Sequence, residues 1–301
     1  MTDTELPVLV VGEALMDVVR SPSGETELPG GSPANVALGL ARLGLDVQFL
    51  TALAPDTRGG QIAAHLRGSG VSVLPESFSL QATSSAVAQI AEDGAAHYDF
   101  DVRWSLPEDF VASPSALLHT GSIAAFLAPG AGAVLDLMHT APTPLVSFDP
   151  NIRPALLGSQ HATVQLFEAA VTAATVVKLS DQDASWLYPA RTAQEVARHV
   201  HGLGPILVAV TLGSEGALLR SGETVIEVAA DRVRVADTIG AGDTFMASLI
   251  RSVLLADDGF DAAWLKRTGQ IAATAAAITV SRPGANLPTL MELDERAKLR
   301  K

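Results

Sequence analysis

The sequence predicts an α/β fold in which helices cover both faces of a mostly parallel central sheet. Short apolar runs alternate with longer helical patterns along the chain, and this order is typical of parallel sheets. The 301 residues are 48% hydrophobic, which is enough to bury a large core. No linker, repeat or low-complexity tract divides the chain, so we expect a single domain over residues 1–301.

Each expected element follows from its local pattern. The strands are apolar runs, and the helices carry apolar residues at intervals of three and four. The expected strands are Val8–Val11, Val47–Leu50, 116–119, 145–148, 175–179 and 206–211. The expected helices between them are 33–43, 58–68, 130–139, 161–173 and 192–203.

Two segments break this alternation. Residues 14–19 and 86–100 alternate between apolar and polar side chains, which predicts strands, and Asp93-Gly94 marks a hairpin turn in the second segment. They belong to the regions 13–30 and 84–102. We expect these regions to form an insertion on the domain rather than an independent unit.

Charge and composition exclude several classes of function. The net charge of −13 and the isoelectric point near 4.9 argue against nucleic acid or an anionic membrane as a partner, since both need clustered Lys and Arg. The chain has no cysteine, which excludes disulfides and thiolate catalysis. Residues 1–7 contain neither a basic nor an apolar leader segment, so a cytoplasmic location is expected. Small molecules remain the natural ligands.

The segment 237–246, D-T-I-G-A-G-D-T-F-M, is the most informative part of the chain. It places the carboxylate of Asp243 in the first turn of a helix, behind Gly240 and Gly242. Backbone N–H groups at a helix N-terminus bind anions, so the turn Gly240-Ala241-Gly242 can hold a phosphoryl group. We therefore interpret Asp243 as a general base that takes a proton from an attacking hydroxyl. The alternative is a glycine-rich turn capped by an acid.

A second motif, G-G-S-P-A-N-V-A, occupies residues 30–37. Ser32 is expected to cap a helix whose first residue is Pro33, and Gly44 is expected just past its end. Asn35 then lies in the first turn, where its amide can bind a polyol, and the glycines allow a ligand close to the backbone. An ordinary capped helix is the alternative.

With these motifs the chain resembles the ribokinase-like (PfkB) family of sugar kinases over nearly its whole length. Three further elements support the resemblance: D-P-N-I-R at 149–153, which is similar to bacterial fructokinases, K-L-S-D-Q-D at 178–183, and T-L-G-S-E-G at 211–216. The resemblance implies transfer of the γ-phosphate of ATP to a sugar or nucleoside hydroxyl, with Mg²⁺ and a stimulating monovalent cation such as K⁺. It also implies that the inserted strands form a lid over the sugar.

The resemblance carries roles to individual residues. It makes Asp243 the base, with Arg153 and the turn Gly240, Ala241 and Gly242 stabilising the phosphoryl charge. It assigns the sugar to Asp17, Gly30, Gly31, Asn35 and Phe100, the nucleotide to Lys178, Ser180, Thr211, Gly213 and Gly216, Mg²⁺ through water to Asp183, and the monovalent cation to Asp237. Two residues depart from the family pattern, because Asp183 replaces the usual glutamate and Ser180 the common asparagine.

Fructose is the expected acceptor. The lid regions carry few cations, Arg20 and Arg103 being the clearest, so a phosphorylated sugar is disfavoured. The alternatives are 2-keto-3-deoxygluconate, ribose or a nucleoside, and outside catalysis a sugar-binding regulatory protein that kept the fold. A homodimer is compatible with the same resemblance.

Overall fold

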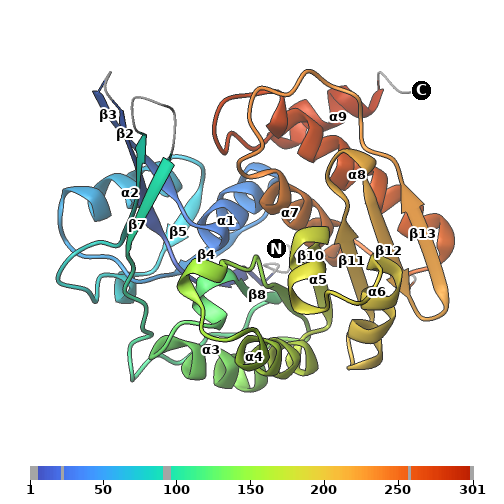
Figure 1. Cartoon of the computed structure of the whole chain (residues 1–301), viewed down its shortest axis with the longest axis horizontal. Helices are drawn as coiled ribbons and strands as arrows, with labels where there is room; N and C mark the ends of the chain where they lie inside the picture. Colours follow the sequence, from blue (N-terminus) through green and yellow to red (C-terminus); the bar gives the residue numbers. More distant parts are fainter. Residues whose placement is uncertain (1–5, 22–23, 91–95, 257–258, 299–301) are drawn as a thin grey trace, which may run out of the picture.

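The computed structural model describes residues 6–21, 24–90, 96–256 and 259–298 and confirms the α/β fold (Figure 1). A nine-stranded sheet forms its centre, in the order β13-β12-β11-β10-β9-β8-β1-β4-β5. Its strands are β1 (Val8–Val11), β4 (Val47–Leu50), β5 (Val71–Val73), β8 (Leu117–Gly121), β9 (Val146–Asp149), β10 (Val176–Ser180), β11 (Leu207–Thr211), β12 (Ala217–Ser221) and β13 (Thr224–Val228).

The six strands predicted as apolar runs all lie in this sheet and pair with one another in parallel, with bounds displaced by a residue or two at most. β5, β12 and β13 were not predicted from the sequence. β12 and β13 form an antiparallel hairpin on the edge of the sheet beside β11. The T-L-G-S-E-G segment connects β11 to β12, and the antiparallel pairing of these two strands fixes the position of this loop.

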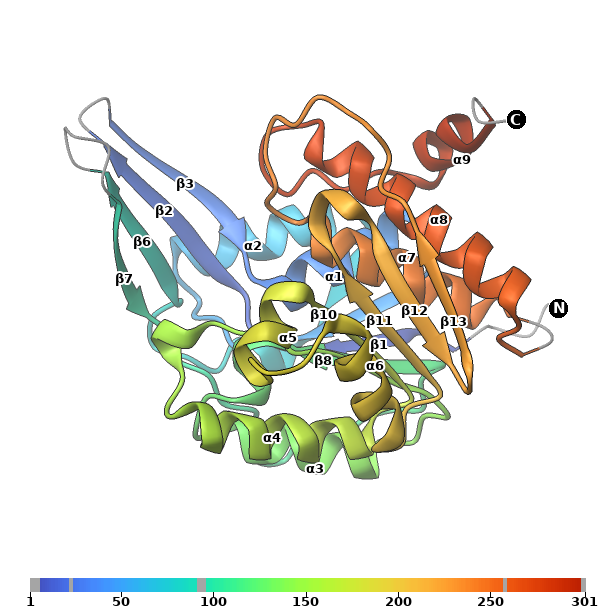
Figure 2. The ribbon, with the colours of Figure 1, turned by 45° about the vertical axis from the view of Figure 1, so that its right-hand side comes forward.

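Helices cover both faces of the large sheet, as expected (Figure 2). One core packs against α1, α2, α7 and α8, and the other against α3, α4, α5 and α6. The helices are α1 (Ser32–Arg42), α2 (Thr57–Arg67), α3 (Gly130–Thr140), α4 (Gln160–Ala173), α5 (Asp181–Leu187), α6 (Ala193–Gly202), α7 (Ala241–Leu254), α8 (Ala262–Val280) and α9 (Leu290–Lys298). No helix within the described ranges is long and apolar enough to cross a membrane.

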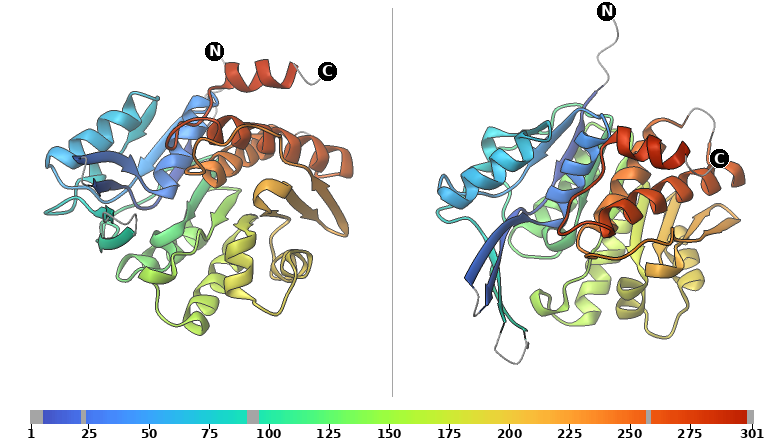
Figure 3. Two further views of the ribbon diagram at one scale, coloured as in Figure 1. Left: turned by 45° about the horizontal axis from the view of Figure 1, so that its top comes forward. Right: turned by 90° about the horizontal axis from the view of Figure 1, so that it is seen from above.

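A four-stranded sheet stands beside the large one and is called here the small sheet (Figures 2 and 3). It consists of β2 (Leu15–Ser21), β3 (Gly24–Gly30), β6 (Ser85–Ile90) and β7 (Ala96–Asp101), in the order β3-β2-β6-β7. These strands fall in the two inserted regions predicted from the sequence. The turn predicted at Asp93-Gly94 lies outside the described residues.

The start of α1 differs from the prediction. The N-cap is Gly31, with φ 106°, and no side chain makes a cap hydrogen bond. Ser32 is the first helical residue and Pro33 the second, so the expected capping by Ser32 is wrong. Only glycine adopts the Gly31 angles readily, and a Cβ there would lie 2.6 Å from the Glu13 carbonyl oxygen. At the other end, Gly44 follows the helix with φ 88°, as predicted.

Candidate active site

A cleft of about 710 Å³ lies where the carboxyl ends of the large sheet's strands face the small sheet. Ligands of open α/β sheets bind at this edge. Every predicted site residue lines the cleft except Gly30 and Asp237. A second, more open groove of about 1040 Å³ lies between the segment 232–236 and α9, and it contains none of them.

The turn that begins α7 has the geometry of an anion site. Gly240 is the N-cap in the left-handed conformation, with φ 77° and ψ 0°. Ala241, Gly242 and Asp243 are the first three helical residues, so their N–H groups have no partner within the helix. The Thr244 hydroxyl donates to the Gly240 carbonyl at 2.8 Å, which secures the turn. The Ala241 N–H donates to the Thr238 carbonyl at 3.3 Å, so the N–H groups of Gly242 and Asp243, two residues that line the cleft, remain to stabilise negative charge there.

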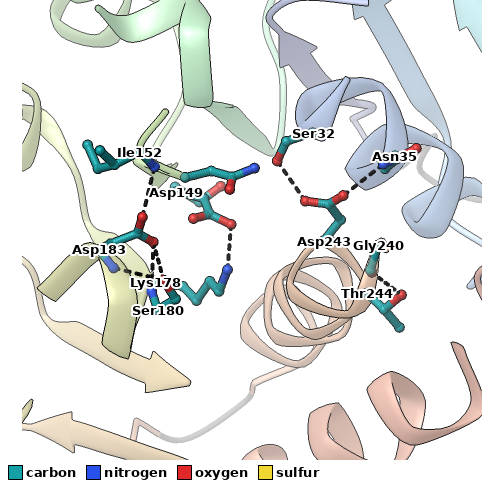
Figure 4. A network of polar contacts seen from close by, with 12 residues as sticks. Ser32, Asn35, Asp149, Ile152, Lys178, Ser180, Asp183, Gly240, Asp243 and Thr244 are labelled. Atoms are coloured by element: carbon teal, nitrogen blue, oxygen red, sulfur yellow. Dashed lines mark hydrogen bonds and ion pairs between the residues drawn. The ribbon is translucent and has the colours of Figure 1, made fainter. Parts of the chain in front are cut away.

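The carboxylate of Asp243 is buried, with 7% of its surface exposed, and both oxygens accept hydrogen bonds (Figure 4). The Ser32 hydroxyl donates to Oδ1 at 2.6 Å, and the Asn35 amide donates to Oδ2 at 2.8 Å. The first turn of α1 therefore holds the carboxylate from the opposite side of the cleft. Asn35, expected beside the sugar, lines the cleft but bonds to Asp243 in this state.

Lys178 lies directly behind the anion turn. Its ammonium forms a buried ion pair with Asp149 at 2.8 Å, and a Cβ on Gly242 would lie 2.9 Å from the same nitrogen. Burial raises the pKa of Asp149 to about 6, although the Lys178 charge opposes this shift. The three neighbouring carboxylates Asp149, Asp183 and Asp243 raise the pKa of Lys178 against the effect of burial, so the lysine stays charged.

Ser180 and Asp183 form a capping box at the start of α5. Asp183 Oδ2 accepts from the Ser180 N–H at 2.9 Å and from its hydroxyl at 2.7 Å, and Oδ1 accepts from the Ile152 N–H at 2.8 Å. Protein donors thus occupy both oxygens of the residue expected near Mg²⁺. Within the described ranges, no three His, Asp or Glu residues gather as a metal-binding group.

The small sheet brings Asp17 to the opposite wall of the cleft, on β2. A Cβ on Gly30 would lie 2.0 Å from Asp17 Oδ2, so the absent side chain of Gly30 makes room for this carboxylate. Asp17 is exposed to the cleft, yet the protein around its carboxyl removes part of the surrounding water and raises the pKa of Asp17 to about 6, against the charge of Arg153. Phe100, on β7, lines the same wall.

Arg153 projects from the loop after β9 and is exposed to the cleft. Its Nη1 donates to the Ile152 carbonyl at 3.1 Å, and its charge opposes the rise in the pKa values of both Asp17 and Glu13. The guanidinium therefore acts electrostatically on both carboxylates from within the same cleft.

Thr211, Gly213 and Gly216, the remaining residues predicted to bind the nucleotide, line the cleft at and after the end of β11. Thr211 ends β11, Gly213 has φ 55°, and a Cβ on Gly216 would lie 1.9 Å from the Val228 carbonyl oxygen. Asp237 lies outside the cleft lining, and its two oxygens accept from the N–H groups of Ile239 and Gly284 at 3.0 and 2.9 Å. These bonds lower the pKa of Asp237. The bond from Gly284 also connects the segment before the anion turn to the loop after α8.

Glu13 is a cleft residue that the sequence analysis overlooked. Its side chain is 3% exposed, accepts from the Ala124 N–H at 3.0 Å and bonds to Ser122. Burial raises the pKa of Glu13 to about 7. Ser122 has φ 53° and Asn151 has φ 36°, a conformation that is strained outside glycine, and both line the cleft. An acid directly after a buried parallel strand is the signal that could have identified Glu13.

Comparisons with known proteins find relatives over nearly the whole chain. Residues 6–291 match the pfkB family carbohydrate kinase pattern. A Salmonella typhimurium fructokinase is 32% identical over 92% of this chain and 94% of its own. A double mutant of Vibrio cholerae O395 fructokinase, with fructose, ADP and potassium ion bound, superposes with a TM-score of 0.83 at 26% identity, covering 98% and 99% of the two chains.

A second structural neighbour has a different acceptor. Aminoimidazole riboside kinase from Salmonella enterica, complexed with aminoimidazole riboside and an ATP analogue, gives a TM-score of 0.81 at 28% identity. The match covers 96% of this chain and 99% of that one. The neighbours therefore include kinases for a free sugar and for a riboside.

Proposed function

Because this chain belongs to the pfkB family of carbohydrate kinases and is a sugar kinase, we propose that fructose is the acceptor to which it transfers the γ-phosphate of ATP. One wall of the cleft, formed by Asp17, Phe100 and Arg153, is called here the sugar wall. The observation that carries the choice of fructose is the charge of this wall. Of the described residues that line the cleft, Arg153 and Lys178 are the cations, and Lys178 is paired with Asp149. Arg20 and Arg103 are paired with Glu25 and Asp101. An uncharged polyol suits this wall better than a sugar phosphate.

The proposed reaction is an in-line transfer. Asp243 takes the proton of the sugar hydroxyl while the hydroxyl oxygen attacks the γ-phosphorus, and ADP leaves. The N–H groups of Gly242 and Asp243, joined by that of Ala241 once it leaves the Thr238 carbonyl, stabilise the charge that grows on the phosphoryl oxygens. Asp17 accepts hydrogen bonds from hydroxyls that do not react. The small sheet covers the sugar and excludes water, which would otherwise compete as the acceptor.

The cations belong to the same proposal. Mg²⁺ would arrive with ATP and supply charge neutralisation for the phosphates, and Asp183, whose oxygens already accept from protein donors, would hold it through water. K⁺ is proposed beside Asp237, whose carboxylate is kept ionised by two backbone N–H groups. A cytoplasmic location and a homodimer also stay proposals, the second supported by Val19 and Leu28 of the small sheet, which are 41% and 53% exposed.

A coupled ADP-release assay tests the acceptor. Purified protein with Mg-ATP is offered fructose, ribose, 2-keto-3-deoxygluconate, fructose 6-phosphate and aminoimidazole riboside, with Asp243→Asn as the control for a contaminating kinase. We expect the highest kcat/KM with fructose. A higher kcat/KM with aminoimidazole riboside would mean that the acceptor is a riboside, as in the second structural neighbour, and not fructose. Sugar binding without turnover would favour the regulatory alternative.

A further inference from the structure

Two donors from one turn of α1 hold the two oxygens of Asp243. The Ser32 hydroxyl donates to Oδ1 at 2.6 Å, and the Asn35 amide donates to Oδ2 at 2.8 Å (Figure 4). An ionised carboxylate can only accept, so both partners must be donors. Hydrogen bonds to a charged group are among the stronger ones in proteins. The carboxylate is therefore fixed in orientation before any substrate arrives.

The packing of α1 against α7 makes this geometry possible. A Cβ on Gly39 of α1 would lie 3.0 Å from the Cβ of Ala247 on α7, so the two helices approach closely at this point. Gly31 supplies the N-cap conformation, and no side chain is needed to cap the helix. The Ser32 hydroxyl is consequently available to Asp243, and the residue is only 9% exposed.

The two donors are not equivalent. The Ser32 hydroxyl has a single proton to donate, and its one donated hydrogen bond goes to Oδ1 of Asp243. Asn35 keeps a second amide proton and a carbonyl oxygen, so it can turn from Asp243 to a hydroxyl of the sugar. Arrival of the sugar can release Oδ2, whereas Oδ1 stays bound to Ser32.

We propose that Ser32 is a positioning residue that holds Asp243 by Oδ1, so that Oδ2 is the atom that takes the proton from the sugar hydroxyl. This inference rests on the proposed role of Asp243 as the base. The proton moves from the hydroxyl to Oδ2 and the hydroxyl oxygen forms the new bond to the γ-phosphorus. The bond from that phosphorus to the β–γ bridging oxygen breaks, and its electron pair leaves with ADP. Asn35 yields Oδ2 to the reacting hydroxyl as it turns toward the sugar.

The test compares kcat and KM for fructose and ATP in four variants: Ser32→Ala, Ser32→Thr, Asp243→Asn and the double variant Ser32→Ala with Asp243→Asn. We expect Ser32→Ala to lower kcat by roughly tenfold, as loss of one hydrogen bond to a charged group implies, with both KM values nearly unchanged. Ser32→Thr keeps the hydroxyl and should restore most of kcat. In the Asp243→Asn background, Ser32→Ala should have no further effect, because the residue acts through Asp243.

Each other result overturns a defined part of the inference. A kcat for Ser32→Ala within about twofold of wild type, with Asp243→Asn strongly impaired, removes the positioning role and leaves the base. A change in the KM for fructose alone makes Ser32 a sugar ligand. If Ser32→Ala lowers kcat as much in the Asp243→Asn background as in the wild type, Ser32 does not act through Asp243. Full activity of Asp243→Asn overturns the role of Asp243 as the base, on which this inference rests, and leaves the choice of acceptor to the sugar panel. If Ser32→Ala does not fold, Ser32→Cys replaces it, because a thiol is a weak donor.

Discussion

The two walls of the cleft are built differently. On the phosphoryl wall, Asp243, Lys178 and Asp183 are buried and already bonded to protein partners, on helices and strands that pack into the large sheet. On the sugar wall, Asp17 and Arg153 are exposed to the cleft, and Asp17 stands on the small sheet. The groups proposed to react are thus fixed in advance, while those proposed to recognise the sugar are open to a ligand. Substitutions on the first wall should change kcat, and those on the second should change KM.

The substitution Gly242→Val tests the phosphoryl wall. It should lower activity more than a substitution on the sugar wall does. Gly242 has no positive φ, so the backbone accepts a side chain, but its Cβ would lie 2.9 Å from Lys178 Nζ. The side chain must displace the ammonium from behind the anion turn and from Asp149. We expect kcat to fall on the order of 10²-fold, as when a transition-state anion loses one donor, with little change in the sugar Kd.

Steady-state kinetics and equilibrium binding of fructose measure the two quantities for Gly242→Val. Gly242→Ala is the matched variant, and its smaller side chain should give a smaller loss of kcat. A folded Gly242→Val protein with near-normal kcat would show that the turn does not hold the reacting group.

Asp17→Ala tests the sugar wall. Loss of one charged hydrogen bond to a hydroxyl of fructose should lower kcat/KM by roughly ten- to a hundredfold, chiefly through KM. Glu25→Ala is the control, because Glu25 is an exposed, ion-paired residue of the same small sheet. If Asp17→Ala abolishes turnover at saturating fructose, the division between the two walls is wrong.

The dependence of the KM for fructose on acidic pH tests the sugar wall a second time. Because the pKa of Asp17 is raised to about 6, the carboxyl loses its charge as the pH falls below that value. The KM for fructose should therefore rise below pH 6 in the wild type. In Asp17→Asn, which has no charge to lose, this part of the pH dependence should disappear.

The sequence predicted the fold and the chain position of most cleft residues, because both depend on local patterns. The buried runs and helical periods are read within one element, and the family motifs are contiguous. The parallel order followed from alternation, whereas the edge hairpin β12–β13 interrupted it and was missed. The resemblance added the small sheet's place beside the cleft.

Contacts between distant segments could not be predicted in this way. Ser32 reaches Asp243 across 211 residues of sequence, and Glu13 reaches Ala124 across 111. A serine before a proline at a helix start fits the capping pattern, and only the Gly31 conformation shows that no side-chain cap is used. Lys178 was assigned to the nucleotide from its motif, but its pairing with Asp149 appears only when β9 and β10 are neighbours.

Glu13 carries the smallest expected effect, which is on stability. Its pKa is about 7 in the folded protein and 4.5 ordinarily, so between these values the folded state binds more protons than the unfolded state. The contribution of Glu13 to the free energy of unfolding is then fully present below pH 4.5 and falls as the pH rises to 7. Above pH 7 the ionised carboxyl costs roughly 2–4 kcal/mol.

Glu13→Gln should remove this cost, because glutamine stays neutral and keeps an oxygen that can accept from the Ala124 N–H. Urea unfolding of wild type and variant from pH 5 to pH 8 measures the difference in free energy. We expect the variant to gain stability relative to wild type as the pH rises, with Glu25→Gln, on an exposed carboxyl, showing no such trend. A pH-independent difference would mean that Glu13 is already charged in the folded protein at pH 5. The buried acid would then belong with the charged, fully partnered groups of the phosphoryl wall.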